Sequence, residues 1–158
     1  MSGLNKIPIM KAQPQSIDAE ESVLGIVLTK PETITQVKEY IPKVDIFYYD
    51  TSRIIWSKML ELNENHQEID PISIMAKLSD SEKKKVTAFY VSGLFTNVVT
   101  TANLVNHAKI VLEKFLQREL INTTYKIQES AYNNTEKFDE LIESMKKLGS
   151  RDMIMKLY

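Results

Sequence analysis

The side chains that most often carry out chemistry in proteins are scarce in this sequence. There are two histidines, His66 and His107, and no cysteine. His107 falls within a helical segment, with Asn103 one turn before it and Val111 one turn after it, which is not the H-E-x-x-H spacing of a zinc site. The lack of cysteine excludes disulfides and cysteine-ligated metals. We therefore predict no metal site, and we interpret both histidines as structural or surface residues.

The residues needed for catalysis or cofactor binding are also missing. The four glycines lie at positions 3, 25, 93 and 149. A Walker A loop needs two glycines five residues apart, followed by Lys and Ser or Thr, and no pair has that spacing. The glycine spacings of a dinucleotide-binding fingerprint and of a nucleophile elbow are also absent. The sequence predicts a chain that is not an enzyme, with no catalytic residue and no cofactor.

Two groups of residues resemble sites but have simpler structural interpretations. Three acidic residues follow the good helix N-cap Ser16: Asp18, Glu20 and Glu21. A first helical turn favours negative charge, and we expect that placement to account for them fully. Six aromatic residues carry rings that could stack on bases: Phe47, Tyr48, Tyr49, Trp56, Phe89 and Tyr90. No basic stripe accompanies them, so we expect them to pack in a core.

The charge balance argues against strong DNA binding by this chain alone. The sequence has 20 basic and 21 acidic residues, for a formal net charge of −1, whereas nucleic-acid binders carry a basic excess or stripe. Its basic run is Lys83-Lys84-Lys85, which follows Asp80 and Glu82. We interpret this run as a solvated loop or helix end.

Length and composition indicate one globular domain rich in helix. The 158 residues include 43% hydrophobic and 26% charged residues, but only 4 Gly and 5 Pro, which favours long helices. No stretch approaches 18 apolar residues, so we predict no membrane span. We expect the chain to work in the cytoplasm of a bacterium or of a phage-infected bacterium.

The first hundred residues read as about five helices of a compact head. The first helix runs from the Ser16 cap to Lys30, and a second short helix ends near Tyr40. Residues 44–49 are expected to be a loop that places aromatic rings in the core. Asp50 or Thr51 is expected to cap a third helix, and Asp70-Pro71 starts a fourth. Residues 79–85 are interpreted as a polar loop before a fifth helix.

The last third predicts a long antiparallel two-helix hairpin. Residues 102–132 contain neither Gly nor Pro and predict a helix of roughly 30 residues, about 45 Å long. A turn at 133–135 leads to a final helix, with Gly149 suited to its end. The apolar stripes exceed what a hairpin can bury alone, so either the head covers the hairpin face or a partner does. We predict that they form a protein interface, through Val111, Phe115, Leu116, Ile121, Phe138, Leu141, Ile142 and Met145.

These elements give a simple domain organisation for an all-α chain. Residues 1–12 are expected to be a flexible lead. Residues 13–150 form the helical domain, with the head at 13–100 and the hairpin at 102–149. Residues 151–158 are a tail or the beginning of a linker.

Several segments resemble the N-terminal domain of DnaB-type replicative helicases. Residues 14–25, PQSIDAEESVLG, are similar to that family's opening pattern P-x-S-x-E-A-E-x-x-V-L-G. Further similar segments follow in the same order: DIFY at 45–48, Ile69-Asp70, ANLVNHAKIV at 102–111 and KFLQRELI at 114–121. The sequence departs from the family at 50–53, where a His is usual, and at 85–88, where a Gly-rich element is common.

The resemblance implies a non-catalytic oligomerisation and docking domain. It implies that hairpins pair between subunits, as dimers or as a hexamer built from three dimers. It also implies primase, and in some systems a helicase loader, as partners. Two alternatives remain open: a stand-alone phage or plasmid protein that mimics this domain to load or inhibit a host helicase, and the helicase-binding domain of a primase.

Overall fold

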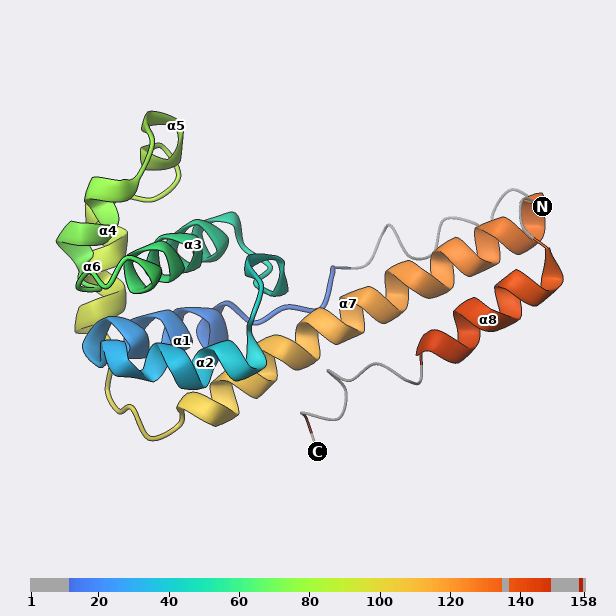
Figure 1. The fold of residues 1–158 in the computed structure, drawn as a ribbon, viewed down its shortest axis with the longest axis horizontal. Helices are drawn as coiled ribbons and strands as arrows, with labels where there is room; N and C mark the ends of the chain where they lie inside the picture. Colours follow the sequence, from blue (N-terminus) through green and yellow to red (C-terminus); the bar gives the residue numbers. More distant parts are fainter. Residues whose placement is uncertain (1–11, 135–136, 149–156, 158) are drawn as a thin grey trace. The chain divides into compact units, whose positions relative to one another are not determined.

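Every secondary-structure element that the structure describes is helical (Figure 1). The structure is a computed structural model that describes residues 12–134, 137–148 and 157. In chain order the helices are α1 (Ile17–Thr29), α2 (Ile34–Tyr40), α3 (Asp50–Glu64), α4 (Pro71–Lys77), α5 (Asp80–Lys83), α6 (Ala88–Thr96), α7 (Leu104–Asn133) and α8 (Phe138–Leu148). Two 3₁₀ turns, η2 (Pro31–Thr33) and η3 (Val44–Ile46), separate the early helices. No described helix is both long enough and apolar enough to cross a membrane.

The chain divides into two units. The head unit is Gln15–Leu112, and the hairpin unit is Met1–Pro14 together with Glu113–Tyr158. Within the hairpin unit, α8 runs back antiparallel to the later turns of α7 (Figure 1). Asn134 between them adopts a left-handed φ of 51°. The prediction of an all-α fold with a compact head and an antiparallel hairpin is confirmed. The expected lead at 1–12, the tail after 150, and the helix stop at Gly149 lie almost wholly outside the described residues.

The core of the head unit is built around Phe47 and Trp56. Both side chains are fully buried, and their ring centroids lie 5.9 Å apart at an interplanar angle of 57°. Phe47 follows η3 and inserts its ring into the core as expected, but residues 44–46 of the expected loop form η3, and Tyr48 and Tyr49 stay half-exposed instead of packing in the core. Other large side chains that are fully buried in this unit are Leu24, Ile26, Ile34, Ile41, Ile46, Ile55, Met59, Leu62, Ile74 and Leu112.

Two local predictions in the head were wrong. Residues 79–85 were expected to form a loop, but Ser79 starts the short helix α5. The Ser79 hydroxyl accepts the backbone N–H of Glu82, and the Glu82 carboxyl group accepts the backbone N–H of Ser79 in return. This reciprocal capping box satisfies donors at the helix start. The N-cap of α3 is Tyr49, without a side-chain cap, rather than Asp50 or Thr51.

Asp70 starts α4 as the sequence predicts. Its Oδ1 accepts the backbone N–H of Ser73 at 2.9 Å, its Oδ2 accepts the Ser73 hydroxyl at 2.8 Å, and Pro71 occupies the first helical position. The Ser73 backbone N–H, and next the Ser73 hydroxyl, hold the pKa of Asp70 below its ordinary value. Because the folded pKa is depressed, the stabilisation is present above the unfolded pKa and is lost as the pH falls through the folded value.

We expect Asp70→Ala to lower the free energy of unfolding by about 1 kcal/mol at neutral pH, because the first turn of α4 loses its cap. The difference from the parent should shrink as the pH falls below about 4, where the parent carboxylate also becomes protonated. Urea denaturation at pH 7 and pH 3 measures both effects. The control Asp70→Asn keeps a capping oxygen and should lose only a few tenths of a kcal/mol at pH 7. An equal loss in both variants would contradict the capping role.

Candidate protein-interaction surface

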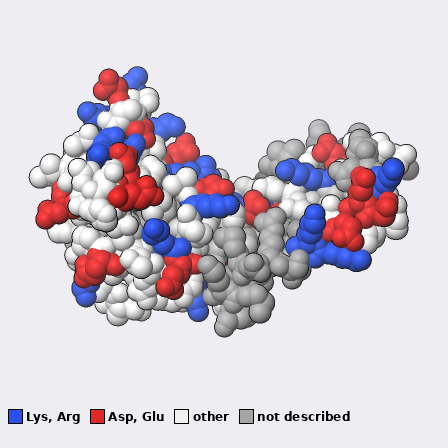
Figure 2. All heavy atoms as spheres, viewed as in Figure 1, with Lys and Arg blue, Asp and Glu red and all other residues white. Residues whose placement is uncertain are grey.

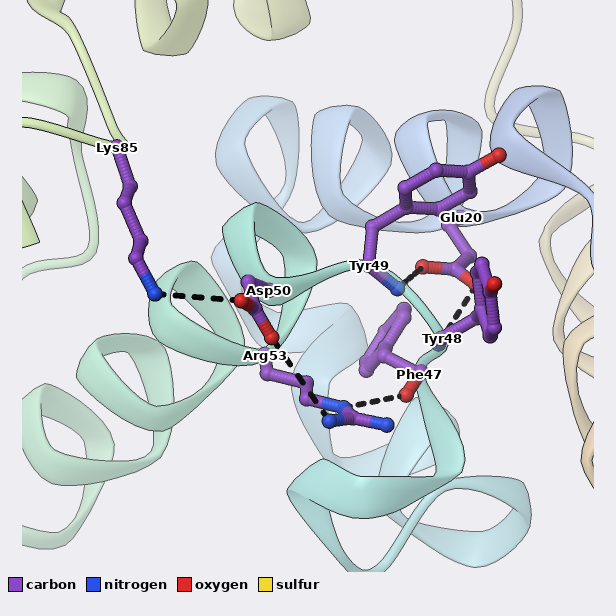
Figure 3. A network of polar contacts seen from close by, with 7 residues as sticks. All are labelled: Glu20, Phe47, Tyr48, Tyr49, Asp50, Arg53 and Lys85. Atoms are coloured by element: carbon purple, nitrogen blue, oxygen red, sulfur yellow. Dashed lines mark hydrogen bonds and ion pairs between the residues drawn. The ribbon is translucent and has the colours of Figure 1, made fainter.

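Glu20 of α1 holds the segment that leads into α3. Its side chain is only 2% exposed, and its two carboxyl oxygens accept the backbone N–H groups of Tyr48 at 2.9 Å and Tyr49 at 3.3 Å. Figure 3 shows the carboxyl group reaching both N–H groups from the neighbouring helix. The expectation that a first-turn position accounts fully for Glu20 was therefore wrong. Glu20 satisfies backbone donors 28 and 29 residues away in the chain.

Charged side chains hold the same segment from its other side (Figure 3). Arg53 donates from Nε to the backbone carbonyl of Phe47 at 2.8 Å, and its guanidinium lies 3.8 Å from the Asp50 carboxylate. Lys85 lies 3.2 Å from the other Asp50 oxygen. These ion pairs are exposed, so each contributes at most about 1 kcal/mol. The Arg53 hydrogen bond is the contact that joins α3 directly to the backbone after η3.

The segment held in this way presents two half-exposed tyrosines. The rings of Tyr48 and Tyr49 lie edge to face, with centroids 5.0 Å apart and an interplanar angle of 87°. The Tyr49 hydroxyl donates to Oε1 of Gln15 at 2.8 Å. A pair fixed like this loses little conformational entropy on contact with a partner.

The third acidic residue, which the sequence placed in the first turn, lies just beyond that turn in α1 and also has a specific partner. Glu21 accepts the hydroxyl of Tyr90 at 2.9 Å, which links α1 to α6. Burial raises the pKa of Tyr90 above its ordinary value, and the hydrogen bond to Glu21 raises it further. The phenol therefore stays protonated and remains a donor to Glu21 throughout the ordinary pH range.

Ser22 and His107 form a pair that has the residue types of a catalytic dyad. The Ser22 hydroxyl lies 2.6 Å from Nδ1 of His107. Nucleophilic catalysis also needs a third group that orients the imidazole and donors that stabilise an oxyanion. The described residues make no hydrogen bond to the other ring nitrogen of His107, and they hold no His, Asp and Glu cluster that could bind a metal. The pair is a structural link within the head unit, in line with the interpretation of His107 from the sequence.

The residues predicted as an interface differ widely in exposure. Within the hairpin unit, Phe138 is 78% exposed and Met145 is 55% exposed, whereas Leu141 is buried. Val111 lies in the head unit and is buried there. The remaining four are partly exposed: Phe115, Leu116, Ile121 and Ile142. The face that a partner can reach is therefore concentrated at Phe138 and Met145 of α8.

Further exposed apolar side chains escaped the sequence prediction. In the hairpin unit these are Leu120 and Tyr132. In the head unit they are Ile72, Phe89, Phe95 and Val99. The expectation that Phe89 packs in a core was wrong, since it is 90% exposed. Helix α6 packs on α1 and α4, and it buries Val91 and Leu94, so Phe89 lies on the opposite face.

Charges of both signs are mixed on the face of the head unit that Figure 2 shows. Of the three consecutive lysines, Lys83 ends α5, and Lys85 pairs with Asp50. This arrangement agrees with a solvated helix end, one of the two placements that the sequence predicted for the run.

Comparisons of this sequence with a family model and with curated proteins point to the same family. The family model "DnaB-like helicase N terminal domain" matches residues 12–113. The replicative DNA helicase DnaB of Geobacillus stearothermophilus is 33% identical over 132 residues, which cover 82% of this chain and 29% of the helicase. The replicative DNA helicase DnaC of Bacillus subtilis is 29% identical over 136 residues, or 85% of this chain and 30% of that protein. The chain thus spans less than a third of the length of these curated relatives.

Solved structures agree with the sequence matches. The N-terminal domain of DnaB helicase from Mycobacterium tuberculosis superposes with a TM-score of 0.79 at 26% identity, covering 88% of this chain and all of that domain. A DnaB-like replicative helicase, described with its interactions with primase, superposes with a TM-score of 0.69 at 24% identity. That match covers 89% of this chain and 33% of the helicase, so it supports the fold.

Proposed function

Because this chain belongs to the family of DnaB-like helicase N-terminal domains, we propose that it is a non-catalytic module that joins proteins in a DNA-replication assembly. The match is to the N-terminal domain of these helicases and not to their ATPase domain. In this proposal the hairpin unit pairs with a second copy, and three such dimers complete a hexameric ring. Other surfaces of the domain dock primase and, in some assemblies, a helicase loader.

The observation that supports self-association is the apolar surface of the hairpin unit. Phe138 and Met145 stand exposed on the same face of α8, two turns apart, and Leu120 and Tyr132 add exposed apolar area on α7. Burial of such area yields about 25 cal/mol per Å², from which the cost of association is subtracted. Exposed aromatic and Met side chains are also the residue types enriched at the centres of interfaces.

We expect the parent chain to be at least a dimer at micromolar concentration, and Phe138→Asp to shift it to monomer. Asp at the first position of α8 suits the helix dipole, so the variant should fold normally. Multi-angle light scattering measures the molar mass, and Ile72→Asp, which changes an exposed apolar residue of the head unit, is the matched control. A parent chain that is monomeric at high concentration would refute self-association. If Phe138→Asp and Ile72→Asp lower the molar mass equally, the interface is not formed by the hairpin unit.

Primase is the partner that the structural neighbour suggests. That neighbour is described together with its interactions with primase, and we carry the partner over to this chain as part of the proposal. Molar mass in solution with and without a cognate primase tests it directly: a complex of defined stoichiometry is expected. Absence of any mass change at concentrations well above micromolar would remove primase from the proposal.

Because its acidic and basic residues nearly balance, we do not expect this chain alone to bind DNA strongly. The bacterial relatives favour the bacterial cytoplasm as its place of action.

A further inference from the structure

The head unit has a groove lined by η2 and the start of α2 together with the end of α3 and the loop before α4. Its volume is about 460 Å³, a size typical of pockets that bind ligands. The lining combines apolar and acidic side chains, chiefly Pro31, Ile34 and Ile69 with Glu32, Glu68 and Asp70. Among the described residues, no lysine, arginine or histidine lines it. The groove therefore offers negative charge beside apolar side chains.

The segment that supplies one side of the groove carries an uncompensated negative charge. Between Lys58 and Lys77 the chain has four acidic residues and no lysine or arginine. Both of these lysines already have partners: Lys58 lies 3.3 Å from the Glu82 carboxylate, and Lys77 lies 3.3 Å from that of Glu61. The basic residues at the two ends of the segment are thus engaged outside the groove.

Two carboxylates of the groove are exposed and available to a partner. Within the part of the chain that the structure describes, Glu32 and Glu68 form no ion pair and no side-chain hydrogen bond. Asp70 caps α4 through Ser73, and that contact holds the pKa of Asp70 below its ordinary value, so its charge persists at neutral pH. Carboxylates gathered along one groove raise the local concentration of cationic groups.

We propose that this groove binds a basic segment of a partner protein, whose lysine or arginine side chains pair with Glu32 and Glu68 while an aliphatic side chain packs on Pro31. The proposal rests on the proposed role of the domain in joining proteins, and it identifies one docking surface and the charge of its partner. Complementary charge across an interface speeds encounter and selects the partner. Ile72, two residues after Asp70, is 83% exposed and adds apolar surface beyond the cap of α4.

Other classes of ligand match this groove less well. A nucleic acid or an anionic membrane would be repelled by its carboxylates. A metal ion needs several ligands that converge on one point, and the described residues hold no group of three His, Cys, Asp or Glu side chains placed to bind one. A polypeptide can bring separate positive charges and an apolar side chain together. A free polyamine shares the ammonium groups but lacks the apolar side chain, so it serves as a competitor in the test.

Peptide binding to the full chain tests the groove. The probe is a fluorescein-labelled nonapeptide that alternates lysine and leucine, and a peptide that alternates glutamate and leucine is its control. We expect the parent to bind the lysine peptide saturably, and Glu32→Gln/Glu68→Gln to weaken binding about tenfold, because two exposed ion pairs are lost. Both residues are exposed, so the variant should keep the helix content of the parent by circular dichroism. Fluorescence anisotropy at about 0.1 M salt measures the dissociation constants, since distant charges are then largely screened.

The matched control variant is Glu113→Gln/Glu129→Gln, which removes the same charge from exposed positions of α7 and should leave binding within about twofold of the parent. Equal weakening in the two double variants would indicate general attraction to acidic residues and would overturn the groove. Saturable binding of the glutamate peptide would overturn it as well. Displacement of the lysine peptide by an equimolar amount of spermidine would assign the groove to free polyamines instead.

Failure of the groove and failure of the joining role give different results. If the parent does not bind the lysine peptide saturably, the groove proposal is wrong, and a rise in molar mass with primase would still support the joining role. If the lysine peptide binds in the groove but the chain forms no complex in the molar-mass measurements, the joining role fails and the groove keeps its preference for basic segments.

Discussion

Replacing Glu20 with alanine is expected to lower the free energy of unfolding by about 3 kcal/mol, because two backbone donors would lose their acceptors inside the protein. Glu20 is 2% exposed, and its carboxyl group accepts the N–H groups of Tyr48 and Tyr49. Neither the alanine methyl group nor water in a well-packed interior can replace it fully. For a chain of this length the melting temperature should fall by roughly 10 °C, which differential scanning calorimetry measures.

Two controls identify the cause of this loss. Asp18 lies in the same first turn but is exposed, so Asp18→Ala removes only its interaction with the helix dipole and should cost under about 1 kcal/mol. Glu20→Gln keeps one acceptor oxygen but turns an amide N–H₂ group toward a backbone donor, so its loss should fall between the two alanine variants. Equal losses for Asp18→Ala and Glu20→Ala would mean that the helix dipole alone explains these acidic residues.

Local signals along the chain predicted most of the fold. Ser16 and Asp70 start helices because a short oxygen-bearing side chain can cap the backbone two or three residues ahead, and the sequence displays that pattern directly. The capping box at Ser79 and Glu82 is equally visible in the sequence, but its polar surroundings resemble a loop, and the helix that it starts spans only four residues.

Contacts between distant segments could not be predicted in the same way. Nothing in the sequence near Glu20 shows that its carboxyl group meets a loop 28 residues later. Phe89 illustrates the same limit, since helical spacing leaves open which face of α6 meets α1 and α4. In the candidate interface, the stripe on α8 was predicted, but only the fold separates the buried Leu141 from the exposed Phe138 and Met145.

Glycine 25 determines how closely α1 and α6 approach, and a single methyl group there is expected to be costly. A Cβ atom on Gly25 would lie 2.5 Å from the backbone carbonyl oxygen of Leu94 and 2.9 Å from Cγ2 of Val98. The carbonyl oxygen belongs to the backbone of α6 and cannot turn aside as a flexible side chain can. We expect Gly25→Ala to lower the free energy of unfolding by about 2–3 kcal/mol, within the range of overpacked cores.

The sign of this effect is informative, because alanine normally stabilises a helix interior relative to glycine by about 0.5–1 kcal/mol. Gly93 of α6 supplies the matched control, since a Cβ atom there would meet only the Asn97 side chain at 3.9 Å, an ordinary contact distance. Gly93→Ala should therefore raise the free energy of unfolding by about that intrinsic amount. Guanidinium denaturation of both variants should give shifts of opposite sign. If both variants are stabilised, the two helices can separate without loss, and their close contact does not contribute to the stability of the head unit.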